Sequence, residues 1–148
     1  MAKKSHQQII LAQNFLTSSK LVRSLLDTSS IESCDIVCEI GSGRGIITAE
    51  LARIARKVIA IEKDRALVQQ LRERFQDTSN VEIIENDYLQ YRIPNSEYKI
   101  FANIPYNSTA DIVRKILYAP PIPSEAINRR TAICSAELAI PHRQVKDA

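Results

Sequence analysis

Glycine is scarce in this chain of 148 residues, which contains three glycines where average usage near 7% would give about ten. Long hydrophobic runs are also missing, because the unbroken apolar stretches, such as residues 58–61, stay far below the roughly 20 residues that a membrane-spanning helix needs. The N-terminus has neither the long apolar core nor the small-residue cleavage site of a signal peptide. We therefore expect a cytoplasmic protein without membrane contact.

Metal-binding patterns are missing from the sequence as well. The three cysteines, Cys34, Cys38 and Cys134, are odd in number and form no C-x-x-C pair, and neither His6 nor His142 stands at metal-ligand spacing. We therefore expect no disulfide framework and no metal site, with the cysteines reduced and mostly buried. The length suits one globular domain, and the net charge of +3 permits a polyanionic partner without requiring one.

The three glycines stand together at Gly41, Gly43 and Gly45. An apolar, β-branched run at 35–40 precedes them, and apolar residues at helical spacing follow from residue 46. This order predicts a strand, a tight turn and a helix, in which the backbone can approach a ligand without obstruction by Cβ atoms. The E-x-G-x-G-x-G spacing differs from the G-x-G-x-x-G of dinucleotide sites and favours S-adenosylmethionine over NAD, with simple loop chemistry as the alternative.

Strand and helix patterns alternate further along the chain, which predicts a Rossmann-like α/β fold, a parallel sheet with helices on both faces. Expected strands cover residues 58–62, 81–87 and 98–105, and expected helices cover 20–27, 64–75 and 109–119. From residue 119 a P-P-I-P run breaks any helix and the periodicity is weak. We therefore assign residues 1–118 to the catalytic domain and 119–148 to a divergent tail, which holds a short strand near 131–134 or is a loosely ordered end.

Carboxylates stand at the ends of two expected strands. Glu62 ends the second strand about 20 residues after the first glycine, the place of an acidic residue that accepts both ribose hydroxyls of a nucleotide. Asp87 ends the third strand, where it could accept a hydrogen bond from an adenine amine. A strand-end aspartate alone is more often a cap or a turn residue, so this reading depends on its alignment with the other sites.

The fourth expected strand ends in N-I-P-Y at residues 103–106. The Asn103 amide oxygen and the Ile104 carbonyl could accept hydrogen bonds from the amino group of an adenine, which would favour its more nucleophilic, pyramidal form. Tyr106 offers a ring on which the target base can stack, and Pro105 rigidifies the backbone. Such a base must be unpaired or flipped out, which suits a structured single-stranded region of RNA. A strand-terminating turn with a packed tyrosine is the alternative.

Five motifs in order carry a family resemblance: Q-N-F-L at 13–16, E-I-G-S-G-R-G at 39–45, I-E-K-D at 61–64, E-N-D at 85–87 and N-I-P-Y at 103–106. In this order they resemble the rRNA adenine N6-dimethyltransferases. Q-N-F-L-T-S and the isoleucine at position 104 look more like the Erm branch, which modifies 23S rRNA, than the KsgA branch, which modifies 16S rRNA. The resemblance implies S-adenosylmethionine-dependent methylation of an adenine in 23S rRNA and resistance to macrolides, lincosamides and streptogramin B.

The resemblance also implies a role for particular residues. Asn14 and Leu16 would line the cofactor entrance, Gly41 would contact the methionine part, and Asn103 would lie beside the methyl group. Together the implied cofactor-binding residues are Asn14, Leu16, Gly41, Gly43, Glu62, Asp87 and Asn103, and the implied catalytic residues are Asn103, Ile104 and Tyr106. The basic start of the chain resembles an arm of the family that can touch RNA. A solvated terminus is an equally good interpretation of these basic residues.

The sequence departs from the family in length. Erm-like proteins are considerably longer and add a small helical domain that helps to hold rRNA, whereas the resemblance fades here after about residue 125. We expect an incomplete sheet whose fourth strand is an exposed edge, in a monomer that keeps cofactor binding while rRNA methylation is weakened or lost. A methyltransferase for another substrate and a non-catalytic remnant that binds S-adenosylmethionine stay open as alternatives.

Overall fold

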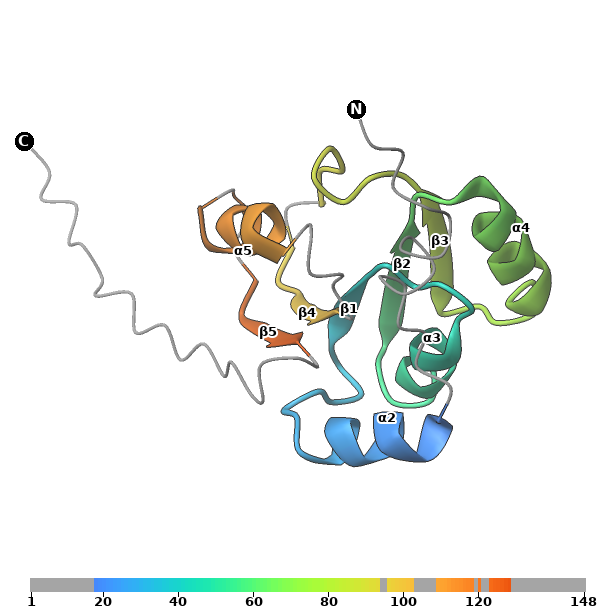
Figure 1. Ribbon diagram of the computed structural model, residues 1–148. Helices are drawn as coiled ribbons and strands as arrows, with labels where there is room; N and C mark the ends of the chain where they lie inside the picture. Colours follow the sequence, from blue (N-terminus) through green and yellow to red (C-terminus); the bar gives the residue numbers. More distant parts are fainter. Residues whose placement is uncertain (1–17, 94–95, 103–108, 119, 121–122, 129–148) are drawn as a thin grey trace, which may run out of the picture.

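The computed structural model describes residues 18–93, 96–102, 109–118, 120 and 123–128. Helices and strands alternate along this part of the chain (Figure 1). The elements are α2 (Ser19–Asp27), β1 (Ile36–Ile40), α3 (Ile46–Leu51), β2 (Lys57–Glu62), α4 (Arg65–Arg74), β3 (Val81–Glu85), β4 (Lys99–Ala102), α5 (Thr109–Tyr118) and β5 (Glu125–Asn128).

The strands form one sheet in the order β3-β2-β1-β4-β5, and each neighbouring pair is parallel. From β1 the chain builds outward through β2 to β3 and then crosses to the other side for β4 and β5. The order therefore reverses between β1 and β4, and ligands of open α/β sheets bind at such a switch point, outside the carboxyl ends of the strands. The predicted Rossmann-like fold is confirmed.

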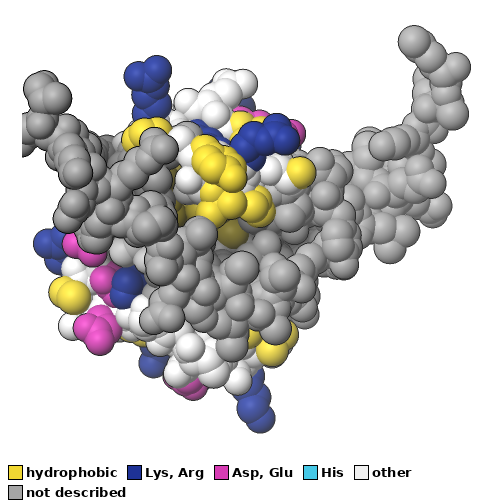
Figure 2. Space-filling model, turned by 90° about the vertical axis from the view of Figure 1, so that its left-hand side faces the viewer, with side chains coloured by type: hydrophobic (Ala, Val, Ile, Leu, Met, Phe, Trp, Pro, Cys, Tyr) yellow, Lys and Arg dark blue, Asp and Glu magenta, His cyan; other side chains and the backbone are white. Residues whose placement is uncertain are grey.

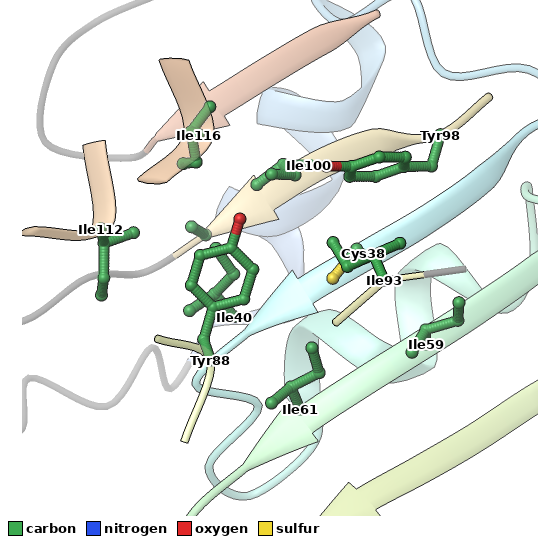
Figure 3. Packing of buried hydrophobic residues seen from close by; sticks show 11 residues of the cluster. Cys38, Ile40, Ile59, Ile61, Tyr88, Ile93, Tyr98, Ile100, Ile112 and Ile116 are labelled. Carbon is green, nitrogen blue, oxygen red and sulfur yellow. The ribbon is translucent and has the colours of Figure 1, made fainter. Parts of the chain in front are cut away.

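Side chains alternate between the two faces of the sheet, as the pleat requires. On one face Cys38 and Ile40 of β1 pack in a core cluster with Ile112 and Ile116 of α5, and Figure 3 shows these side chains pointing toward one another. On the other face Val37 belongs to a second cluster with residues of α2 and α3. Helices thus cover both faces, which is why the central strands are nearly fully buried.

Strand β5 corrects one expectation about the end of the sheet. It pairs in parallel with β4, with Lys99 opposite Glu125 and Ala102 opposite Asn128. The expectation that the fourth strand is an exposed edge is therefore wrong, because β4 has partners on both sides. β5 also lies beyond residue 118, where the sequence analysis ends the catalytic domain. The short strand expected near 131–134 lies outside the described residues.

No helix in the described ranges has both the length and the apolar character needed to span a bilayer.

Candidate active site at the carboxyl ends of the strands

The glycine-rich turn leaves β1 at its carboxyl end and leads into α3. Gly41, Gly43 and Gly45 have φ values of 74°, 55° and 77°, in the left-handed region. The amides of Gly41 and Ser42 donate to the Ile61 carbonyl at 2.9 and 3.3 Å, and the Gly45 amide donates to the Ser42 carbonyl at 2.9 Å. These bonds close the turn and hold it against the end of β2, the neighbouring strand.

Two of the glycines are needed for different reasons. A Cβ added at Gly41 would have no described atom within 4 Å, so the space beside this residue is open. A Cβ added at Gly45 would lie 2.7 Å from side-chain atoms of both Leu71 and Phe75, so this glycine lets α4 pack closely against the turn. The turn therefore has an open side at Gly41 and a packed side at Gly45.

Glu62 braces the turn from the end of β2. Its side chain is nearly buried, with a relative exposure of 8%. One carboxylate oxygen accepts from the Gly43 amide at 2.9 Å, and the other accepts from the amides of Lys63 and Asp64, each at 2.9 Å. Because an ionised carboxylate has roughly four acceptor positions, capacity remains for a ligand hydroxyl. The sequence predicts a ligand role for Glu62, but it does not reveal the hydrogen bond that the Gly43 amide donates to its carboxylate.

A second carboxylate, Glu39, lies fully buried at the end of β1. Its Oε2 accepts from the Thr48 hydroxyl at 2.6 Å, while its Oε1 and the buried Ser42 hydroxyl find no hydrogen-bond partner among the described residues. Burial raises the pKa of Glu39 to about 7, against the lowering effect of the Thr48 hydrogen bond. The nearby charge of Glu62 raises it further. From the sequence Glu39 is recognised only as the end of the strand, although it is also the first residue of the E-x-G-x-G-x-G motif.

Asp87 lies at the same edge of the sheet. β3 ends at Glu85, which is paired with Glu62, and the Asn86 amide donates to the Glu62 carbonyl at 3.0 Å. Oδ1 of Asp87 accepts from the Leu89 amide at 2.9 Å. Asp87 is thus a turn residue, which was the alternative interpretation of this strand-end aspartate. Its second carboxylate oxygen is the one that could accept a hydrogen bond from a ligand.

Four of the residues implied in cofactor binding are therefore brought together, since Gly41, Gly43, Glu62 and Asp87 follow the carboxyl ends of β1, β2 and β3. β4 reaches the same edge, because Ala102, its last residue, is paired with Ile40. The other implied residues lie outside the described part of the chain: Asn14, Leu16, Asn103, Ile104 and Tyr106.

A separate cavity of about 760 Å³ lies along α5. It is lined in part by Tyr88, Tyr91, Arg92 and Tyr118, and it contains none of the implied cofactor residues. Figure 2, which faces the α5 side of the molecule, shows hydrophobic side chains gathered beside Lys and Arg side chains. Within the described ranges no group of three or more His, Cys, Asp or Glu residues could hold a metal ion.

The site fits a ligand that combines a nucleoside with a positive charge. The open space at Gly41 lies between Glu62 and Asp87 on one side and the end of β4 on the other. The carboxylates of Glu62 and Asp87 lie at this edge, and carboxylates favour a donor or a cation nearby. S-adenosylmethionine has ribose hydroxyls, an adenine amine and a sulfonium charge, so the residues present fit it.

Comparisons with known proteins find relatives among the rRNA methyltransferases. The family model for ribosomal RNA adenine dimethylase matches residues 4–138. An rRNA adenine N-6-methyltransferase from Bacteroides fragilis is 35% identical over 118 residues, which cover 80% of this chain and 44% of that protein. A ribosomal RNA small subunit methyltransferase A from Acaryochloris marina is 36% identical over 124 residues, which cover 78% of this chain and 45% of that protein.

Among solved structures, that of the 23S rRNA methyltransferase ErmE is 35% identical with a TM-score of 0.68, and it covers 74% of this chain and 45% of ErmE. The chain thus spans less than half the length of the relatives it matches. The family model nevertheless covers nearly the whole chain. The chain belongs to the ribosomal RNA adenine dimethylase family.

Proposed function

We propose that this chain is the cofactor-binding part of an S-adenosylmethionine-dependent rRNA adenine N6-methyltransferase. S-adenosylmethionine is the cofactor of the family. The observation that carries the proposal is the open space at Gly41, at the carboxyl edge of the sheet that Glu62 and Asp87 share. A ligand in that space meets two carboxylates from neighbouring strands and a backbone without a Cβ atom.

The described residues bind and orient the cofactor in this proposal. Glu62 accepts from a ribose hydroxyl at the position that its three backbone amides leave, and Asp87 accepts from the adenine amine with the oxygen that does not bond the Leu89 amide. Gly41 admits the methionine part to the backbone, and the carboxylates of Glu62 and Asp87 at the same edge of the sheet favour a cation nearby. When bound, S-adenosylmethionine supplies an electrophilic methyl group on its sulfonium.

The remaining chemistry rests on the N-I-P-Y motif, which lies outside the described residues. Asn103 and the carbonyl of Ile104 accept the two hydrogen bonds of the target amino group, and Tyr106 stacks on the adenine ring. With the cofactor bound, this nitrogen would receive the methyl group, S-adenosylhomocysteine would be the leaving group, and the proton released from the nitrogen would pass to solvent. Positioning supplies most of the rate in such a transfer. Asn14 and Leu16 line the cofactor entrance.

For the RNA we propose an adenine of 23S rRNA, with resistance to macrolides, lincosamides and streptogramin B as the consequence. Isoleucine at position 104 and the 35% identity to ErmE favour this target. The similar identity to a small subunit methyltransferase keeps 16S rRNA as the competing substrate. We propose residues 1–118 as the catalytic portion and 119–148 as a divergent tail that adds β5 to the sheet, in a cytoplasmic monomer.

Two measurements test the proposal. Isothermal titration calorimetry should show binding of S-adenosylmethionine by the folded chain, and a folded chain that does not bind it contradicts the proposal. Transfer of labelled methyl groups should then be measured with protein-free 23S rRNA, with 16S rRNA and an Asn103→Ala variant as controls. Transfer to 23S rRNA alone that the variant loses supports the proposed target, and transfer to 16S rRNA alone overturns it.

A further inference from the structure

The last turn of α4 contacts the glycine-rich turn at residues other than those that Glu62 holds. A guanidinium nitrogen of Arg74 donates to the backbone carbonyl of Arg44 at 2.6 Å, across 30 residues of sequence. The same guanidinium lies 5.3 Å from the centroid of the Phe75 ring, a cation–π distance that fixes its direction. Arg74 belongs to none of the motifs that carry the family resemblance.

The carbonyl that Arg74 holds belongs to a peptide unit that is fixed at both ends. The other end of that unit is the Gly45 amide, which donates to the Ser42 carbonyl at 2.9 Å. Because a peptide unit is planar, the two bonds together set its orientation. The Cα of Gly45 also packs against Leu71 and Phe75 of the same helical end, where even a Cβ would collide.

The turn is thus clamped between two structures. On the inner side Ile61 and Glu62 hold the amides of Gly41, Ser42 and Gly43. On the outer side Arg74 holds the carbonyl of Arg44. A turn with three glycines has many alternative conformations, so the loss of one clamp lowers the population of the arrangement that leaves Gly41 open. Apparent affinity falls in proportion to that population.

We propose that Arg74 is a positioning residue for the cofactor, which acts by holding the Arg44 carbonyl and thereby the glycine-rich turn in its binding conformation. This inference rests on the proposed function, because it needs a cofactor at Gly41. A hydrogen bond from a charged donor is strong, but Arg74 is exposed, so we expect Arg74→Ala to weaken binding of S-adenosylmethionine about 5- to 20-fold.

The test compares dissociation constants of S-adenosylmethionine for the full chain and three variants by isothermal titration calorimetry. Arg74→Ala removes the bond, and Arg74→Lys keeps a donor and should restore part of the affinity. Arg72→Ala is the matched control, since it removes the same charge from the same helix, where Arg72 lies 3.7 Å from Glu85 and does not contact the turn. We expect the Arg72→Ala dissociation constant to stay within about twofold of wild type.

Adenosine is the second probe, because it lacks the methionine part that would lie at Gly41. A positioning role predicts that Arg74→Ala weakens S-adenosylmethionine more than adenosine, which Glu62 and Asp87 hold from other strands. A merely structural role would weaken both probes equally, and that result overturns the inference. Circular dichroism checks that each sample is folded, and if Arg74→Ala is unfolded, the same ratio is measured for Arg74→Lys.

The outcomes separate this inference from the proposed function. A folded wild-type chain that does not bind S-adenosylmethionine overturns both together. Wild-type binding with equal dissociation constants for Arg74→Ala and Arg72→Ala overturns the positioning role of Arg74 and leaves the proposed function standing.

Discussion

The carboxylate of Glu62 and the backbone amide of Gly43 are joined by a hydrogen bond of 2.9 Å across 19 residues of sequence. Through this bond the end of β2 fixes the turn that follows β1, the strand beside it. The other oxygen of Glu62 accepts two further amides. Glu62 therefore has a structural task in addition to the ribose contact that we propose for it.

The Glu62→Gln variant keeps the size of the side chain but replaces one acceptor oxygen with an N–H donor. All three protein groups that face the carboxylate are N–H donors, so a glutamine amide nitrogen must meet at least one donor. We expect the free energy of unfolding to fall by about 1–3 kcal/mol, the cost of a buried group left without a partner. Urea denaturation measures this loss, and calorimetry should show at least tenfold weaker binding of S-adenosylmethionine.

Glu85→Gln is the control for that variant. Glu85 is paired with Glu62 in the sheet and carries the same charge, but it is exposed and lies 3.7 Å from Arg72. We expect both stability and cofactor affinity to stay near wild type. Equal losses in the two variants would show that charge at this edge, not the bond to Gly43, is responsible.

Gly41→Ala should mainly impair cofactor binding, whereas Gly45→Ala should mainly lower stability. Both residues have positive φ, which costs an alanine roughly 1–2 kcal/mol. Only Gly45→Ala also forces a Cβ to within 2.7 Å of Leu71 and Phe75, so it should lower the free energy of unfolding by about 2–4 kcal/mol. Gly41→Ala should cost about 1 kcal/mol and abolish cofactor binding, because its Cβ would occupy the open space. Thermal unfolding and calorimetry check the pair, and a Gly45→Ala variant as stable as Gly41→Ala contradicts the packing argument.

The two described cysteines should differ in reactivity. Cys34 is exposed and Cys38 is fully buried in β1, while Cys134 lies outside the described residues. Burial raises the pKa of the Cys38 thiol to about 12, so this thiol stays protonated at neutral pH. In a Cys134→Ser background we expect maleimide to label one cysteine of the native chain at pH 7.5 and two in urea. Mass spectrometry of tryptic peptides identifies them, and rapid labelling of Cys38 in the native chain would contradict the burial.

The sequence predicted those features that local chemistry determines. Three glycines within five residues predict a turn, because few residues other than glycine tolerate φ values in the left-handed region. Alternating apolar runs predicted the parallel sheet, and strand-end carboxylates predicted where Glu62 and Asp87 lie. β5 was missed because E-A-I-N is short and carries no alternation, and its strand conformation depends on backbone pairing with β4.

The features that the sequence did not predict depend on contacts between residues that lie far apart in the chain. Nothing in the sequence shows that Glu62 bonds Gly43 or that Arg74 bonds Arg44, since 19 and 30 residues separate the partners. Arg74 reads as part of the solvated face of a helix, and only the sheet order brings that helix end to the turn. Tertiary placement therefore decides which charged side chains act on the site.

The buried carboxyl of Glu39 should make stability depend on pH. Burial raises its pKa from 4.5 to about 7, so between these values the native state binds a proton that the unfolded state has lost. The free energy of unfolding should therefore fall as pH rises from about 4.5 to about 7 and then level off, by up to about 3 kcal/mol for this group. Below pH 4.5 both states hold the proton and the group contributes nothing to the slope.

Glu39→Gln isolates this contribution, because glutamine keeps the size and an oxygen for the Thr48 hydroxyl but does not titrate. The difference in the free energy of unfolding, variant minus wild type, should rise between pH 5 and pH 7 and stay constant above pH 7.5. Urea denaturation at half-unit steps of pH measures it, with cofactor absent so that binding does not enter. Every other titrating group is common to both proteins, so it cancels in the difference. Parallel curves across this range would mean that Glu39 is ionised in the native state. That result would contradict the prediction, because Glu39 is fully buried at the end of β1.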